Sequence, residues 1–257
     1  ISLLTLITFI ITQVFSLGFG VSLGIIYFKE DDNIRRNATI WTAFYTLLIF
    51  CCCALVILYP LADQISRLLF KEGGFNQLVV FSSISATFGV LCQPFVMQLQ
   101  FENQAMRYTM FNLIATLVTT ALNVVFVVLF RRGVEGWVVS NLIGSVITFV
   151  LFAAIAGKRP TLLQLDVAKK LLWLGLPMVP SFIFMLIMQH SGRYMLQAER
   201  GLEELGVYNI GYTFGMISSL AVNAFTTAWY PYFNSFVSRQ EESRAIFARI
   251  ATNYVAV

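Results

Sequence analysis

The chain has little charge, a single histidine and no long polar segment. Charged residues make up 12% of its 257 residues, against ~25% in soluble domains. Hydrophobic residues make up 58%, and the mean hydropathy is +0.77. A soluble fold of this length cannot bury so much apolar side chain, so lipid must solvate much of the surface. The composition therefore predicts a membrane protein.

The sequence also lacks the motifs of catalysis. Because His190 is its single histidine, it holds no histidine-based triad and no multi-histidine metal site. A Walker loop, a dinucleotide-binding glycine fingerprint and an HExxH motif are missing. The cysteines, Cys51, Cys52, Cys53 and Cys92, have neither metal-ligand spacing nor a good disulfide pattern. We therefore expect no enzyme activity, no metal and no cofactor, and transport energy that comes from a gradient or from the substrate.

Long apolar runs account for most of the chain. A helix needs about 20 apolar residues to cross the hydrocarbon layer, and seven runs separated by short polar breaks meet this requirement. They cover residues 1–28, 38–62, 77–99, 108–130, 134–156, 169–196 and 204–230, and an eighth begins near Ile246. No break is long enough to fold as a soluble domain, so the predicted fold class is an all-α, multi-span helical bundle. Because Ile1 already lies within an apolar run, we expect a fragment of a longer protein.

Basic residues in the short loops predict the orientation of this bundle. If the loop of residues 29–37 is cytoplasmic, eleven lysine and arginine residues lie on the cytoplasmic side and five on the outer side. Basic loops are retained in the cytoplasm, so this orientation is favoured. An odd number of earlier helices would then start the whole protein in the cytoplasm.

A polar segment near residue 158 divides the chain. Residues 160–170 carry four aliphatic side chains followed by Lys169 and Lys170, which fits a short helix on the cytoplasmic surface and equally fits a plain loop. In either case the segment connects two groups of helices. We therefore divide the chain into first-lobe helices at 1–157, with the first helix of that lobe missing, and the start of a second lobe at 158–257.

Polar side chains inside the apolar runs are the candidates for a binding cavity. Such groups are costly in hydrocarbon and face a cavity or another helix. Amides donate and accept hydrogen bonds, as sugar hydroxyls require, although they also join helices in dry bundles. Their number favours a water-filled cavity. The uncharged candidates are Gln93, Gln98, Asn112, Gln189 and Asn223.

Two cationic candidates and two prolines occur in the sixth run. Arg193 is always charged and suits a phosphate group, or it instead extends to the membrane interface. His190 lies one helical turn earlier, where it either strengthens an anion site as pH falls or simply packs between helices. Pro177 and Pro180 each remove a helix hydrogen bond, so they predict either a hinge that bends during transport or a static kink.

Several segments together resemble one transporter family. Residues 175–181 (GLPMVPS) are similar to the helix that opens the family's second lobe, and residues 205–212 (LGVYNIGY) and 224–232 (AFTTAWYPY) to the next helix and its cytoplasmic exit. Residues 133–137 (GVEGW) resemble its tight outer turn, and residues 17–24 (LGFGVSLG) its second helix. In this order, they resemble the polysaccharide-transport family, the oligosaccharide flippases of the multidrug/oligosaccharidyl-lipid/polysaccharide exporter superfamily.

The resemblance implies that the chain covers about helices two to eight of a two-lobed, MATE-like exporter fold. The two lobes would open a central cavity alternately to each side of the membrane. Family members typically move a polyprenyl-pyrophosphate-linked oligosaccharide to the outer leaflet of the plasma membrane. The implied location is thus the cytoplasmic (inner) membrane. Implied partners are membrane lipids, the polyprenyl-linked glycan, a glycan polymerase and biosynthesis enzymes, but no nucleic acid.

One position departs from the family's pattern. The family usually carries an aspartate directly before the arginine, where this chain has Gly192 before Arg193. If that aspartate couples an ion to transport, the coupling must differ here. If it only neutralises the arginine, the site here is more cationic.

Three other functions compete with the flippase interpretation. A multidrug or toxin exporter of the same superfamily should carry acidic cavity residues, for which the candidate is Glu102, near an inner end. A membrane-embedded glycan polymerase should carry catalytic residues in a large extramembrane loop, which none of the polar breaks provides. A seven-helix receptor fits the number of spans alone.

Overall fold

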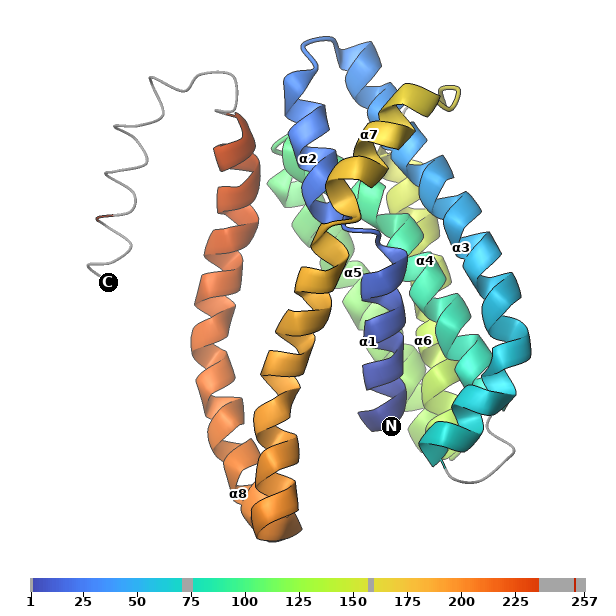
Figure 1. Cartoon of the computed structure of the whole chain (residues 1–257), viewed down its shortest axis with the longest axis vertical. Coiled ribbons are helices and arrows are strands. Elements are labelled where there is room, and N and C mark those ends of the chain that lie inside the picture. The colour runs from blue at the N-terminus through green and yellow to red at the C-terminus, as the bar shows by residue number, and fades with distance from the viewer. Residues whose placement is uncertain (1, 71–75, 157–159, 236–251, 253–257) are drawn as a thin grey trace.

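The chain folds into helices of very unequal length (Figure 1). The computed structural model describes residues 2–70, 76–156, 160–235 and 252, among which no strand occurs. This confirms the predicted all-α fold class. In chain order the helices are α1 (Ser2–Phe15), α2 (Phe19–Lys29), α3 (Asn33–Phe70), α4 (Asn76–Phe101), α5 (Ala105–Asn123), the π-helix η1 (Val124–Leu129), α6 (Gly133–Ala156), α7 (Leu165–Gly175) and α8 (Met178–Ser235).

Six segments of the described residues are long and apolar enough to cross a membrane. They are Thr8–Lys29, Asn33–Pro60, Asn76–Phe101, Ala105–Leu129, Gly133–Ala154 and Leu165–Met185. These segments correspond to the first six predicted runs. The predicted run 204–230 is helical and forms the second part of α8, but it is not one of these six. The run predicted near Ile246 lies outside the described residues.

The first predicted run is interrupted rather than continuous. Between α1 and α2, Leu17 and Gly18 adopt the left-handed conformation, with φ of 49° and 68°. The backbone N–H of Phe19 donates to the carbonyl of Ser16 at 2.8 Å, which closes the turn. A left-handed leucine is unfavourable, and here the side chains of Phe15, Leu17 and Phe19 are all buried around it. Packing therefore holds a turn that hydropathy alone does not reveal.

A second short turn joins α2 to α3 at the predicted cytoplasmic side. The carboxylate of Asp32 accepts a hydrogen bond from the backbone N–H of Ile34 at 3.1 Å, and thus caps the N-terminus of α3. Nε of Arg36 donates to the carbonyl of Glu30 at 2.7 Å. The same guanidinium lies 5.4 Å from the centre of the Tyr27 ring, a cation–π distance. Local polar contacts therefore fix the turn where the chain leaves the membrane.

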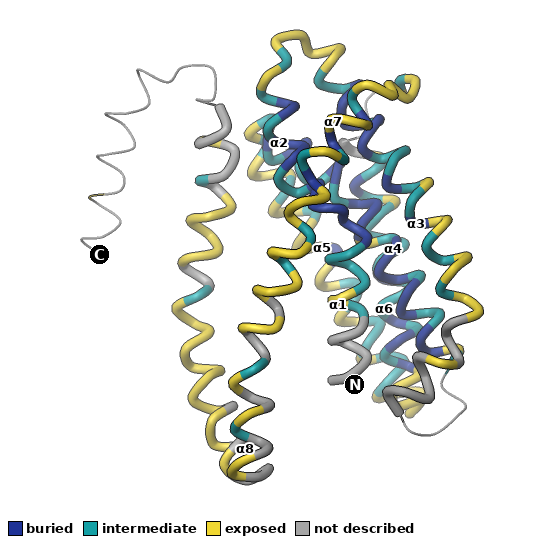
Figure 2. Tube along the Cα trace, in the orientation of Figure 1, coloured by how far each residue is buried: buried dark blue, intermediate teal, exposed yellow. Residues whose placement is uncertain are grey.

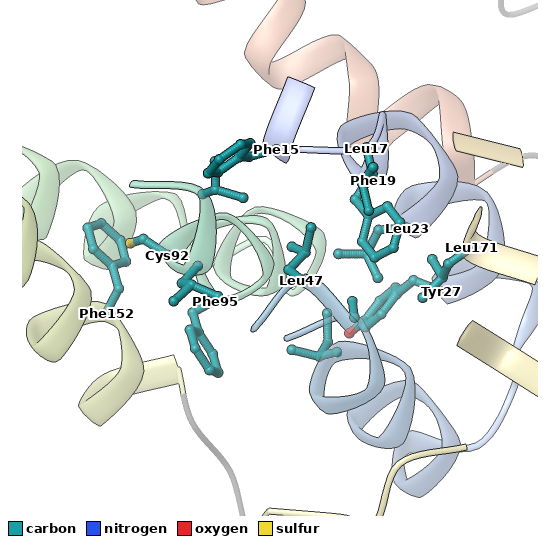
Figure 3. Packing of buried hydrophobic residues seen from close by; sticks show 14 of the residues in the cluster. Phe15, Leu17, Phe19, Leu23, Tyr27, Leu47, Cys92, Phe95, Phe152 and Leu171 are labelled. Carbon is teal, nitrogen blue, oxygen red and sulfur yellow. The ribbon is translucent and has the colours of Figure 1, made fainter. Parts of the chain in front are cut away.

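Helix α4 lies at the centre of the first six helices and makes its most extensive contacts with α6. Phe95 on α4 is 1% exposed, and its ring lies 5.3 Å from Phe44 and 5.5 Å from Trp41, both on α3. Figure 3 shows how the buried side chains of α2, α3, α4 and α7 converge in this core. Because lipid tails are as apolar as these side chains, close packing and hydrogen bonds stabilise the bundle, rather than transfer out of water.

The segment of residues 160–170, predicted to be either a surface helix or a loop, begins without helix and continues as a helix; a place on the membrane surface stays a prediction. Residues 160–164 are not helical, and α7 follows them. Ala168, Leu171 and Gly175 form the buried face of α7, which packs against α2 and α3. A turn at Leu176 and Pro177 then separates α7 from α8. The predicted lobe boundary at 157–158 falls on residues outside those described, so the division into lobes stays a prediction.

Helix α8 is 58 residues long and would extend about 87 Å if it were straight. Figure 1 shows instead that its path reverses direction, which gives two arms. It contacts α1, α2, α4 and α7. Most of its described side chains are exposed (Figure 2), among them Phe184, Met188 and Phe214 at about 70%. The hairpin therefore offers apolar surface to lipid or to further helices.

Candidate substrate-binding cavity

A cavity of about 470 Å³ lies among α1, α4, α5 and α6. Its volume is within the ~300–1,000 Å³ range of small-molecule sites. The α4 part of its wall extends from Ser85 to Val96 and the α6 part from Asn141 to Phe152, so it lies near the middle of both spans. The lining residues are Thr8, Thr12, Ser85, Ala86, Gly89, Cys92, Gln93, Val96, Tyr108, Asn112, Thr119, Asn141, Gly144, Ser145, Thr148 and Phe152.

The threonine hydroxyls in this wall are held by their own helices. Oγ1 of Thr12 donates to the carbonyl of Thr8 at 2.7 Å. Thr119 and Thr148 repeat the pattern four residues back, at 2.8 and 2.7 Å. A hydroxyl has one proton to donate and two lone pairs to accept. Once the proton is used in the helix, the oxygen serves the cavity as an acceptor.

Two asparagines and two serines complete the polar wall. Nδ2 of Asn141 donates to the carbonyl of Trp137 at 2.8 Å, and Nδ2 of Asn112 to the hydroxyl of Tyr108 at 3.3 Å. Among the described residues, no donor is bonded to Oδ1 of either asparagine. Oγ of Ser85 donates to Oγ of Ser145 at 3.3 Å and thereby joins α4 to α6. The wall thus offers several hydrogen-bond acceptors, and the amides of Gln93, Asn112 and Asn141 add N–H donors.

The cavity wall has no formally charged side chain among the described residues. None of these lining residues is an aspartate, glutamate, lysine, arginine or histidine. Within the part of the chain that the structure describes, no group of three histidine, cysteine, aspartate or glutamate residues is placed to hold a metal ion. The chemistry of this cavity is therefore that of neutral hydroxyls and amides.

Two smaller cavities share parts of this wall. One of about 270 Å³ shares Thr8, Thr12, Ser85 and Asn141 with it. Another of about 230 Å³ shares Gln93 and Val96 and is also lined by Phe182 of α8. Gln93 is thus common to a cavity inside the bundle and to one between the bundle and α8.

The structure brings together two of the sequence-predicted site residues. Gln93 and Asn112 both line the large cavity. Gln98 does not: it is 2% exposed and its Nε2 donates to the Glu102 carboxylate at 3.0 Å, toward the end of α4. Asn223 is exposed on the second arm of α8. The backbone at Gln189, His190 and Arg193 belongs to α8, and their side chains lie outside the described residues.

The two prolines occupy different places at the start of α8. Pro177 lies in the turn between α7 and α8, whereas Pro180 lies in the first turn of α8. The first backbone N–H groups of a helix have no acceptor within it, so Pro180 removes no hydrogen bond there. The hinge stays a prediction, and its expected position is the break at Pro177 rather than a bend at Pro180.

The α7–α8 break lies against the α1–α2 break at two glycines. A Cβ added to Gly18 would lie 2.9 Å from the carbonyl carbon of Gly175. A Cβ added to Gly175 would lie 3.3 Å from the carbonyl carbon of Gly18 and 3.2 Å from Oγ of Ser22. The two breaks therefore meet at Gly18 and Gly175, beside the Ser22 hydroxyl, and this meeting point is named the glycine contact.

Reasoning from sequence missed most of the hydroxyl-bearing wall. A signal was present, because Asn141, Ser145, Thr148 and Phe152 follow the spacing of one helix face, and Ser85, Gly89, Gln93 and Val96 do the same on α4. Serine and threonine are common in membrane helices, where they bond to their own backbone. Their presence alone therefore gave no reason to select them.

The sequence matches the family model for polysaccharide biosynthesis protein over residues 1–256. The chain belongs to this family. No curated protein and no solved structure matches it. The chain is thus a membrane protein of polysaccharide biosynthesis or export, and its cavity can be considered in relation to glycans.

We expect the cavity of this polysaccharide biosynthesis protein to be wet. In a variant whose four cysteines are replaced by alanine, single cysteines at Thr12, Asn112 and Asn141 should react with a membrane-impermeant methanethiosulfonate, because polar cavity walls hold water. A cysteine at Leu117, exposed on α5 but not part of the cavity wall, is the control and should stay unlabelled in liposomes. Labelling is measured by mass shift. If the three cavity positions stayed as unreactive as position 117, the cavity would be dry.

Proposed function

We propose that this protein translocates a lipid-linked glycan across the cytoplasmic membrane by alternating access. The observation that carries the proposal is the neutral cavity of hydroxyls and amides at mid-depth of the bundle. Family membership supplies the context, since the chain is one of the polysaccharide biosynthesis proteins. A glycan-carrying lipid is the substrate that combines this context with a membrane-embedded site.

The cavity replaces the water that a sugar loses on entering the membrane. A glycan headgroup cannot cross ~30 Å of hydrocarbon unaided, because each buried hydroxyl without a partner is costly. Hydroxyl and amide oxygens of Thr12, Asn112 and Asn141 offer acceptors at the depth where that cost is greatest. The lipid tail of the substrate would stay in the bilayer beside the bundle.

The junction between α7 and α8 is where a change of access would occur. There α8 leaves the bundle after the break at Pro177, and Phe182 lines the smaller cavity that contains Gln93. Interrupted helices at the substrate site are a feature of alternating-access transporters. In the proposal, movement of α8 about the glycine contact uncovers Gln93 and opens the bundle cavity toward the second lobe.

The cavity wall and α8 differ in charge, so they would bind different parts of the headgroup. The cavity wall offers no cation for a pyrophosphate. His190 and Arg193, which follow on α8, are the proposed pyrophosphate partners, since arginine binds phosphate bidentately. Sugar and phosphate would then be held by different helices. The absence of a carboxylate from the wall gives no support to an exporter of organic cations, which would need one.

Replacing Gln93 by leucine tests this function. Gln93→Leu should lower the rate of glycan translocation in proteoliposomes by about tenfold, because the loss of a hydrogen bond costs about 1–1.5 kcal/mol. The matched control is Gln77→Leu, which changes the same residue type on the same helix outside the cavity and should transport at the normal rate. The assay follows a polyprenyl-pyrophosphate-linked disaccharide that becomes accessible to external periodate. Wild-type protein that moved no such lipid above the protein-free background would refute the proposed function.

A further inference from the structure

The wall of the large cavity also limits which sugars it accepts. We infer that this cavity is a subsite for a neutral sugar unit and that it discriminates against acidic sugars. The inference rests on the proposed function and names the chemical class of glycan that the protein selects. It depends on three observations, which are the direction of the hydrogen bonds in the wall, the lack of charge and the depth of the site.

The hydrogen bonds within the wall decide which of its atoms can still bind a ligand. The hydroxyl protons of Thr12, Thr119 and Thr148 are all committed to carbonyls of their own helices at 2.7–2.8 Å. The oxygens of these residues are left as acceptors, as are the amide oxygens of Asn112 and Asn141. The amides of Gln93, Asn112 and Asn141 add N–H donors to this wall. A ligand that both donates and accepts hydrogen bonds therefore fits it best, as the hydroxyls of a neutral sugar and the acetamido group of an N-acetylated sugar do.

The lack of charge in the cavity wall disfavours the binding of an acidic sugar. A carboxylate brings only acceptors, so the threonine and amide oxygens of the wall give it no hydrogen bond, and only neutral N–H groups can pair with it. Among the described residues of the wall there is no arginine, lysine or histidine to neutralise it. Placing a charge without a counter-charge at this depth costs far more than placing a hydroxyl there. A glucuronate in this cavity therefore loses its hydration without gaining a cationic partner.

The position of the cavity makes this selection effective. Its wall lies near the middle of α4 and α6, so a sugar that passes through the bundle meets it far from either aqueous face. The smaller cavities share its polar residues and extend it toward Trp137 on one side and toward Phe182 on the other. Selection therefore takes place along the path from the bundle to α8 rather than at an exposed mouth.

The experiment compares two substrates in the same proteoliposomes. The probes are polyprenyl-pyrophosphate-linked N-acetylglucosaminyl-glucose and N-acetylglucosaminyl-glucuronate, and translocation is followed by accessibility to external periodate. The full-length protein should move the neutral probe at least about tenfold faster, because the acidic probe must bury an uncompensated carboxylate. The variant Asn112→Arg places a cation in the wall and should reduce or reverse this ratio, while Asn112→Gln keeps a neutral amide and should preserve it.

Each outcome has a distinct meaning. Equal rates for the two probes, or a faster acidic probe in the wild type, would overturn the inference and leave the proposed function in place. Movement of neither probe would overturn the proposed function together with the inference. The wild-type ratio decides the matter even if Asn112→Arg does not fold. A ratio that stays unchanged in a folded Asn112→Arg protein would show that selection lies elsewhere, against the inference.

Discussion

Replacing Gly18 by alanine should prevent most of the protein from reaching a stable fold. The new methyl group would lie against the backbone of Gly175, at 2.9 Å from its carbonyl carbon, and a backbone cannot move aside as a side chain does. The φ of 68° at Gly18 adds a cost of ~1–2 kcal/mol for any residue with a Cβ. Together with an overpacking cost of ~1–3 kcal/mol, this is a large part of a typical stability of ~5–15 kcal/mol.

The measurement is the yield of monodisperse protein and its melting temperature in detergent. Gly20→Ala is the matched control, because a Cβ at Gly20 meets no atom within 4 Å and alanine favours the helix. Gly20→Ala should therefore be as stable as the wild type. Gly175→Ala should behave like Gly18→Ala, since it fills the same contact from the other side. A Gly18→Ala protein with normal yield and melting temperature would show that the two breaks do not touch.

Filling the cavity should stop transport without unfolding the protein. Gly89 lies in the cavity wall, and a Cβ added to it meets no atom within 4 Å. Leucine at this position should therefore fit the helix and occupy the space in which we propose that the sugar binds. A steric cost of about 1–3 kcal/mol for the bound sugar corresponds to a roughly ten- to hundredfold slower translocation of the neutral probe, since every 1.4 kcal/mol is tenfold.

The control for this variant is Gly89→Ala, which adds only the methyl group and should transport within about twofold of the wild-type rate. Melting temperatures should be equal in all three proteins, which separates blocked binding from misfolding. Translocation at the full rate by a stable Gly89→Leu protein would mean that the glycan takes a path outside this cavity. The flippase proposal would then need another site.

Hydropathy predicted the helical bundle well because each span must present about 20 apolar residues to the lipid. The predicted runs at 77–99, 108–130 and 134–156 correspond closely to the helical segments that form α4, α5 with η1, and α6. The interruption at Leu17 and Gly18 was not predicted, because glycine and leucine are both compatible with an apolar helix. What decides it is the glycine contact with residue 175, more than 150 positions away in sequence. Periodicity carries no information about such a pair.

The cavity was predictable only where its residues are unusual for a membrane helix. Gln93 and Asn112 stand out because an amide side chain is costly in hydrocarbon unless it faces a cavity or a polar partner. Gln98 carries the same signal, yet it bonds to Glu102 outside the cavity wall, since residue type does not reveal which face of α4 meets α6. Thr12, Ser145 and other hydroxyls carry no such signal, although they supply much of the wall. Their role became visible only once four helices were placed around one space.

The threonines of the wall have a consequence for how long a sugar stays. With the cavity empty, the protons of Thr12, Thr119 and Thr148 are still bonded within their helices, so departure of the sugar strands no donor. In the proposed transport cycle each contact that the sugar makes would be correspondingly small, and the described wall residues bring no charge that would delay its exit. We therefore expect a short residence time of the sugar in this cavity. That favours a carrier whose transport rate is limited by its own conformational change and not by slow release of the sugar.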